Sequence, residues 1–176
     1  IIGENEILGQ VKSAYEFCRQ LGVTGAELNK LFQSAIATGK LVRDTTNISR
    51  GAYSISSIAI EALRLSMGSS NKPSVLIVGA GVMSSRALAK LSALGYQNLF
   101  LTSRTLEKAE QLSDQFDSVC VFPFGELNSR LNQFDVIYFA TTTKDYLLME
   151  GDIKKIQNPI HIIDIGVPRN VDPGVQ

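Results

Sequence analysis

The sequence predicts an α/β fold: a Rossmann-like, doubly wound parallel sheet preceded by a small helical segment. Short apolar runs of strand length alternate with stretches of helical periodicity from residue 75 onward, which is typical of parallel βαβ units. The first run is joined to the first of these helices by the glycine turn Gly79-Ala80-Gly81. Residues 4–67, by contrast, show helical spacing and loops only.

Two helices are expected at the start of the chain. Apolar residues at helical spacing predict the first over residues 4–21, where a glycine follows. The second is predicted over residues 24–38, with Thr24 as N-cap, Glu27 at the capping-box position and Gly39 as the terminating residue.

A third helix is predicted over residues 54–67, after a polar, irregular stretch at 40–50. Residues 68–73 (GSSNKP) then have the composition of a linker, and we expect the domain boundary there. The alternation that follows predicts strands over residues 75–78, 99–101, 119–122, 135–140 and 160–165, with helices after residue 82, over 106–116 and over 126–131.

The glycine turn predicts a dinucleotide site. Gly79 permits the sharp turn, and Gly81 lets the backbone approach a pyrophosphate at the positive end of the following helix. Ser84 replaces the usual third glycine and is small enough for close helix–strand packing. The alternative is a turn that packs and binds nothing. The candidate residues here are Gly79, Ala80, Gly81, Val82, Met83 and Ser84.

The end of the second predicted strand indicates which dinucleotide is bound. An acidic residue there would favour NAD, but the chain carries Ser103, Arg104 and Thr105, with Lys108 one turn later. A guanidinium group can hold a 2′-phosphate through two hydrogen bonds, so we expect NADPH. The alternative role for the two hydroxyl residues is helix capping.

Two further loops follow the fourth and fifth strands, at the same edge of the sheet. Thr141 and Thr142 offer hydroxyls and backbone donors to the nicotinamide half of a dinucleotide, although a plain loop is an alternative. Arg169 is placed to reach a substrate carboxylate or an interface acid. His161, within an apolar strand, is expected to be a core residue.

Composition excludes several classes of protein. Lys+Arg and Asp+Glu are equal at 17 each, which does not indicate a nucleic-acid-binding surface. The two cysteines do not form a metal or disulfide motif, as expected of a cytoplasmic protein. With a single histidine, the chain cannot form a histidine-rich metal site. No apolar run approaches the ~20 residues of a membrane span. The chain begins with Ile1, which suggests a cut end.

The catalytic chemistry is less evident. Cys18 belongs to a helix stripe and Cys120 to a strand expected to be buried, so both are interpreted as packing residues. Glu4, Glu6 and Gln10 could line a site, or they could be a solvated first helical turn. The residues themselves therefore identify no catalytic group.

Several motifs, in one order, resemble glutamyl-tRNA reductase over almost the whole chain. They are GENEILGQVKSAY at 3–15, LFQSAIATGKLVRDTTNIS at 31–49, GAYSISSIAIE at 51–61, VLIVGAGVM at 75–83, SRT at 103–105 and DIGVPRNVDP at 164–173. The resemblance implies NADPH-dependent reduction of glutamyl-tRNA to glutamate-1-semialdehyde, the entry step of tetrapyrrole biosynthesis. In that family a cysteine forms a thioester with the glutamyl group, and this cysteine would lie upstream of the chain.

The resemblance also implies particular residues and domains. The family's substrate-binding pattern falls on Glu4, Asn5, Glu6 and Gln10, although Glu6 replaces the commoner glutamine. A homodimer would form through a C-terminal domain beyond Gln176. The implied organisation is a helical remnant of the catalytic domain (1–52), a connecting helix and linker (53–72), an NADPH-binding domain (73–170) and the start of a link to the dimerisation domain (171–176).

Two other functions are compatible with the pattern. A small dehydrogenase of the shikimate-dehydrogenase type shares the glycine turn and the phosphate site, but it requires a Lys–Asp pair in a substrate domain that residues 1–50 are too short to form. The third possibility is an NADP-binding sensor or scaffold without catalytic activity.

Overall fold

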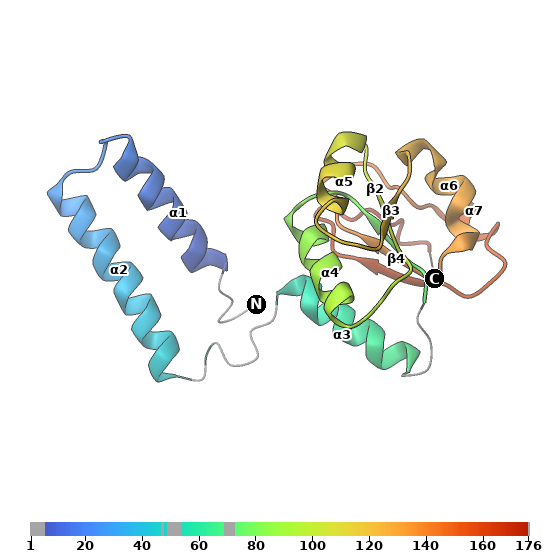
Figure 1. The fold of residues 1–176 in the computed structure, drawn as a ribbon, viewed down its shortest axis with the longest axis horizontal. Coiled ribbons are helices and arrows are strands. Elements are labelled where there is room, and N and C mark those ends of the chain that lie inside the picture. Colours follow the sequence, from blue (N-terminus) through green and yellow to red (C-terminus); the bar gives the residue numbers. More distant parts are fainter. Residues whose placement is uncertain (1–5, 47, 49–53, 69–72, 176) are drawn as a thin grey trace. The chain divides into compact units, whose positions relative to one another are not determined.

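The computed structural model describes residues 6–46, 48, 54–68 and 73–175. The chain divides into two compact units, Ile1–Ser54 and Ile55–Gln176. The first is a pair of helices, and the second is a parallel sheet covered by helices on both faces (Figure 1). The predicted fold class is thereby confirmed.

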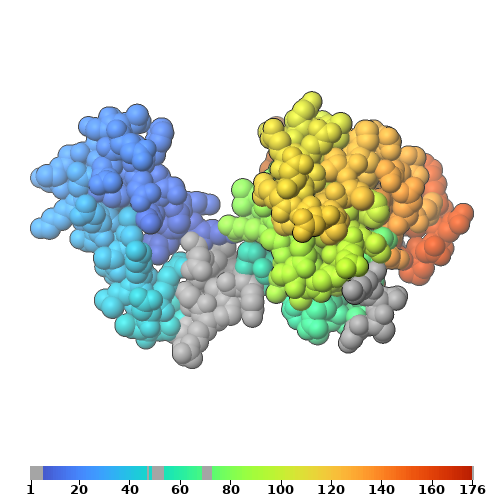
Figure 2. Space-filling model, viewed as in Figure 1, coloured from blue at the N-terminus to red at the C-terminus, as the bar shows by residue number. Residues whose placement is uncertain are grey.

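The first unit is held together by an aromatic contact between its helices α1 (Glu6–Gln20) and α2 (Ala26–Thr45). Tyr15 is the buried residue of α1, and its ring stacks on Phe32 with 5.4 Å between centroids. The Tyr15 hydroxyl donates a hydrogen bond to Asn29 Oδ1 over 3.1 Å. In the space-filling view the side chains of the two helices form one continuous block (Figure 2).

Helix α2 differs from its prediction at both ends. It begins after Gly25, not Thr24, and it continues through Gly39 to Thr45 instead of ending at residue 38. The glycine has a packing role, because a Cβ at Gly39 would lie 3.0 Å from Leu8 Cδ1 of α1. The absence of a side chain thus permits close approach of the two helices, and the polar residues that follow remain helical.

The second unit contains a five-stranded parallel sheet in the order β3-β2-β1-β4-β5. The chain adds β2 and β3 on one side of the central β1 and then crosses to add β4 and β5 on the other. The strand order therefore reverses at β1, and ligands of such sheets bind at the carboxyl ends of the strands beside this point. The strands are β1 (Val75–Val78), β2 (Leu99–Thr102), β3 (Val119–Val121), β4 (Val136–Phe139) and β5 (His161–Asp164).

Helices bury both faces of the sheet. Alternate residues of β1 point to opposite faces, so Val75 and Ile77 join one apolar cluster, and Leu76 and Val78 join the other. This explains why the strand sequence is apolar throughout. One face is covered by α3 (Ile55–Met67), α4 (Val82–Ala93) and α5 (Leu106–Ser113), and the other by η1 (Phe124–Glu126), α6 (Leu127–Arg130), η2 (Leu131–Gln133) and α7 (Glu150–Ile153).

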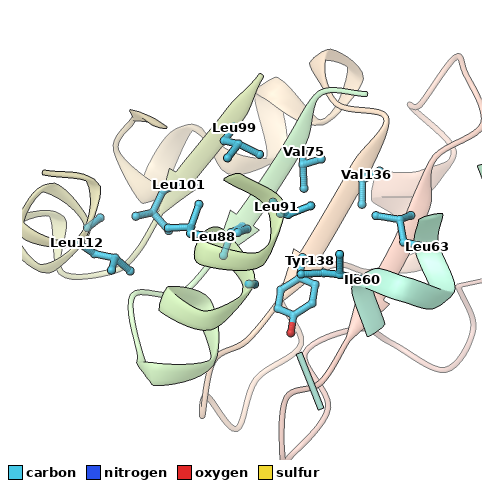
Figure 3. Packing of buried hydrophobic residues seen from close by; sticks show 13 residues of the cluster. Ile60, Leu63, Val75, Leu88, Leu91, Leu99, Leu101, Leu112, Val136 and Tyr138 are labelled. Carbon is cyan, nitrogen blue, oxygen red and sulfur yellow. The ribbon is translucent and has the colours of Figure 1, made fainter. Parts of the chain in front are cut away.

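Helix α3 belongs to the second unit. Its Ile60 and Leu63 are buried in the cluster that α4 forms with β1 and β4 (Figure 3). The division between the units therefore falls between Ser54 and Ile55, and the GSSNKP linker, where the boundary was expected, lies inside the second unit.

Tyr138 of β4 is buried in the apolar cluster that contains Ile60 and Leu63. This burial raises the pKa of its phenol, and a hydrogen bond with Ser56 offsets part of the rise.

Cys120 corrects another expectation. Its strand was predicted to be buried, but β3 is an edge strand of the sheet and pairs with β2 alone. The side chain of Cys120 is accordingly exposed. Cys18 is half-buried in α1, so its place in a helix stripe is confirmed.

Candidate nucleotide-binding site

The turn after β1 has two glycines with different geometric roles. Gly79 has φ +115°, and a Cβ there would lie 2.6 Å from the Ala140 carbonyl oxygen, so only glycine fits. Gly81 is the N-cap of α4, and a Cβ there would meet nothing within 4 Å. No side chain caps α4, so the N–H groups of its first turn remain available to an anionic ligand.

The end of β2 brings cationic and hydroxyl side chains beside this turn. Thr102 is fully buried and anchors the strand end, its Oγ1 donating to the Phe122 carbonyl over 2.9 Å. Arg104 and Lys108 follow it and are exposed. Thr105 is the N-cap residue of α5, but its side chain makes no capping hydrogen bond. The Thr105 hydroxyl therefore does not cap α5 and is available to bind a ligand.

The loop after β4 is held by hydrogen bonds to the side chain of Asn170. The backbone N–H and the hydroxyl of Thr141 both donate to Asn170 Oδ1, over 3.1 Å and 2.9 Å. This hydroxyl is thus used internally, whereas Thr142 is exposed.

These three strand ends share one pocket of about 270 Å³. It unites the glycine turn, the basic end of β2 and the threonine loop, as expected for strands that end at one edge of a parallel sheet. The predicted residues that line it are Gly79, Ala80, Gly81, Ser103, Arg104, Thr105, Lys108, Thr141 and Thr142.

Three predicted cofactor residues do not line this pocket. Val82 is exposed beside it, and the Met83 carbonyl accepts a hydrogen bond from Ser56 Oγ over 3.1 Å. Ser84 is fully buried, in keeping with the close packing expected of a small residue. The backbone N–H groups of these three residues lie in the first turn of α4, at its uncapped N-terminus.

Three lining residues were not among the predicted cofactor residues: Phe124, Ala140 and Leu147. Phe124 begins η1, three residues after the end of β3, so its place near a strand end was a usable signal. Leu147 lies eight residues beyond β4, and its N–H donates to the Asn170 carbonyl over 2.6 Å. This long-range bond left no sequence signal.

The residues expected to bind substrate belong to the first unit. Glu4 and Asn5 lie outside the described residues, Glu6 is half-buried, and Gln10 is exposed on α1.

His161 was expected to be a core residue, but its side chain is only half-buried. Its Nδ1 lies 3.2 Å from Ser66 Oγ. Cys120 does not line the nucleotide pocket.

Arg169 lies away from the nucleotide pocket. It is exposed and lines a separate groove of about 530 Å³ with Asp164 and residues near the end of the chain. Within the described ranges, no cluster of three or more His, Cys, Asp or Glu side chains is arranged to hold a metal ion. A search of the same residues found no helix that is long and apolar enough to span a membrane.

Models of two families match successive parts of the chain. Residues 1–46 match the N-terminal domain of glutamyl-tRNAGlu reductase. Residues 61–176 match the shikimate/quinate 5-dehydrogenase family.

Similar proteins cover nearly the whole chain. Glutamyl-tRNA reductase of Thermodesulfovibrio yellowstonii is 38% identical over 98% of the chain, which spans 41% of that relative. The structure of glutamyl-tRNA reductase from Methanopyrus kandleri is similar with a TM-score of 0.60 at 35% identity, covering 98% of this chain and 45% of that one. The nucleotide-binding domain of the Thermoplasma volcanium reductase, at 19% identity, has a TM-score of 0.57 over 69% of this chain and 83% of that one, a likeness of fold.

Proposed function

This chain belongs to the glutamyl-tRNA reductase family, and its residues 61–176 to the shikimate/quinate 5-dehydrogenase family, and on this basis we propose that its second unit binds NADPH as a hydride donor. The observation that carries the proposal is the shared pocket. It joins an uncapped helix N-terminus at Gly81 to two cations, Arg104 and Lys108. The described residues that line it include no carboxylate that would repel a 2′-phosphate.

Each part of the pocket suits one part of the nucleotide. The backbone N–H groups that follow Gly81 would hold the pyrophosphate, and the space above this glycine lets the phosphates approach. Arg104 would hold the 2′-phosphate through a bidentate contact, with Lys108 adding a second positive charge. Thr142, beyond β4, would meet the nicotinamide half.

For the full-length protein we propose the reduction of glutamyl-tRNA to glutamate-1-semialdehyde. NADPH would supply the hydride that reduces a thioester carbonyl to the aldehyde. From the family resemblance we infer that the thioester cysteine is not within residues 1–176 and that this chain alone is inactive. From the family resemblance we also propose a cytoplasmic homodimer whose substrate binds partly through Glu4, Asn5, Glu6 and Gln10.

The match of residues 61–176 to the shikimate/quinate 5-dehydrogenase family favours one other function, a small dehydrogenase of that type. The two candidates differ in the first unit. Residues 1–46 match the glutamyl-tRNA reductase N-terminal domain instead, and α1 and α2 form a helix pair. This match supports the reductase.

Calorimetric titration of the 176-residue chain with NADPH, NADH and 2′,5′-ADP tests the proposal. We expect NADPH to bind at least about tenfold more tightly than NADH, because one charge-assisted contact contributes about 1.5–3 kcal/mol. We also expect 2′,5′-ADP to bind, since it carries the extra phosphate. Equal affinity for the two dinucleotides, or binding of neither, would refute the assignment.

A further inference from the structure

The turn that follows β5 is closed by one carboxylate. Asp164 Oδ1 accepts a hydrogen bond from the N–H of Gly166 over 2.9 Å. Its Oδ2 accepts from the N–H groups of Asn170 and Val171 over 2.8 Å and 3.0 Å. The three bonds join the end of β5, an edge strand, to residues up to seven positions later, so the turn is fixed on the sheet.

Within this turn Asn170 is fully buried, and its surroundings leave its side chain little freedom. Its Nδ2 donates to the Pro168 carbonyl over 3.3 Å. A Cβ on Gly166 would lie 2.6 Å from Asn170 Oδ1, so the glycine provides the space that the amide occupies.

Asn170 in turn holds both ends of the loop that follows β4. Its Oδ1 accepts two hydrogen bonds from Thr141 at the start of the loop. Its backbone carbonyl accepts from the N–H groups of Leu147 and Leu148 at the end, over 2.6 Å and 3.3 Å. Thr141 and Leu147 both line the nucleotide pocket, so one buried residue fixes the two ends of its wall.

We propose that Asn170 is a positioning residue for the nicotinamide half of the dinucleotide, an inference that rests on the proposed function. The loop it holds follows β4, across the switch point from β2 and Arg104. In sheets of this topology the two halves of a dinucleotide lie on opposite sides of that point. Because the Thr141 hydroxyl bonds to Asn170, Thr141 sets the position of the loop.

The experiment compares two ligands on one variant. Asn170→Ala leaves the Thr141 N–H without its acceptor and should lower NADPH affinity by about tenfold. It should change affinity for 2′,5′-ADP, which has no nicotinamide half, by less than about twofold. A merely structural role would lower the melting temperature and affect both ligands alike, or neither.

Asn132→Ala is the control for loss of an asparagine side chain away from the pocket. Asn132 also joins two backbone segments through its side chain, donating to the Lys155 carbonyl and accepting from Gln157 N–H, but it precedes β4, at the opposite edge of the sheet. Its loss should leave both affinities unchanged. If Asn170→Ala does not fold, Thr141→Val removes the hydroxyl bond from the other partner, and Thr141→Ser, which keeps that bond, should retain NADPH affinity.

The outcomes separate the two claims. Equal loss of both ligands, or unchanged NADPH affinity in a folded Asn170→Ala or Thr141→Val variant, would overturn the positioning role while the NADPH site stands. A wild-type chain that binds neither ligand would refute the site itself, and the positioning role with it.

Discussion

Replacing Arg104 with aspartate should weaken NADPH binding by about 100-fold or more, because the change removes a charge-assisted contact and places a negative charge where the 2′-phosphate is expected. NADH lacks that phosphate, so its affinity should change by less than about threefold. The stability of the chain should stay within about 0.5 kcal/mol of wild type, since Arg104 is exposed. Calorimetric titration with both nucleotides gives the two affinities.

Lys155→Asp is the control for the change of charge. The variant alters the net charge by the same amount, and Lys155 is 77% exposed on its side chain, with a distant contact of 3.8 Å to Asp152. Its carbonyl bonds to Asn132, which precedes β4, so it lies at the opposite edge of the sheet from the pocket. If Arg104→Asp weakened both nucleotides equally, or Lys155→Asp weakened NADPH as much, the 2′-phosphate site would be wrongly assigned.

The two glycines of the β1–α4 turn should respond in opposite ways to replacement by alanine. Gly81→Ala adds a methyl group that meets nothing within 4 Å in the protein, at a φ of −97° that alanine tolerates. Its stability should remain within about 0.5 kcal/mol of wild type. NADPH affinity should nevertheless fall at least about tenfold, because the methyl group occupies the path by which the pyrophosphate approaches.

Gly79→Ala should instead destabilise the fold, by about 3 kcal/mol or more. Its φ of +115° strains any residue with a Cβ, and that atom would lie 2.6 Å from the Ala140 carbonyl oxygen. Gly95→Ala separates the two causes, because Gly95 has φ +80° but a Cβ there meets nothing within 4 Å. Thermal unfolding followed by circular dichroism should give Gly79→Ala a much lower melting temperature than Gly95→Ala.

Wild-type NADPH affinity in Gly81→Ala would contradict the proposed position of the pyrophosphate beside Gly81.

The parts of the fold that the sequence predicts well are those set by local pattern. The apolar runs that became β1 and β4 are buried on both faces, so their composition alone identified parallel strands. The glycine turn was recognisable because a strand and a helix flank it. The predicted pocket residues from three separate strand ends then came together because parallel strands end at one edge.

The parts that escaped prediction depend on contacts distant in sequence. Gly39 has the local signal of a helix end, but its close approach to Leu8 could not be inferred from residues nearby. The composition of residues 68–73 is that of a linker, yet Ile60 and Leu63 attach the preceding helix to the sheet. Leu147 lines the pocket and is bonded to Asn170, twenty-three residues later, a contact for which no local pattern exists.

The most direct test is to map the NADPH contacts by titrating ¹⁵N-labelled chain and following its amide resonances. We expect the largest shifts at residues 79–84, 103–108 and 141–142, with 2′,5′-ADP reproducing those of the first two segments. Shifts centred instead on the groove lined by residues 160–175, or no shift at saturating NADPH, would contradict the claim that these strand ends form the nucleotide site.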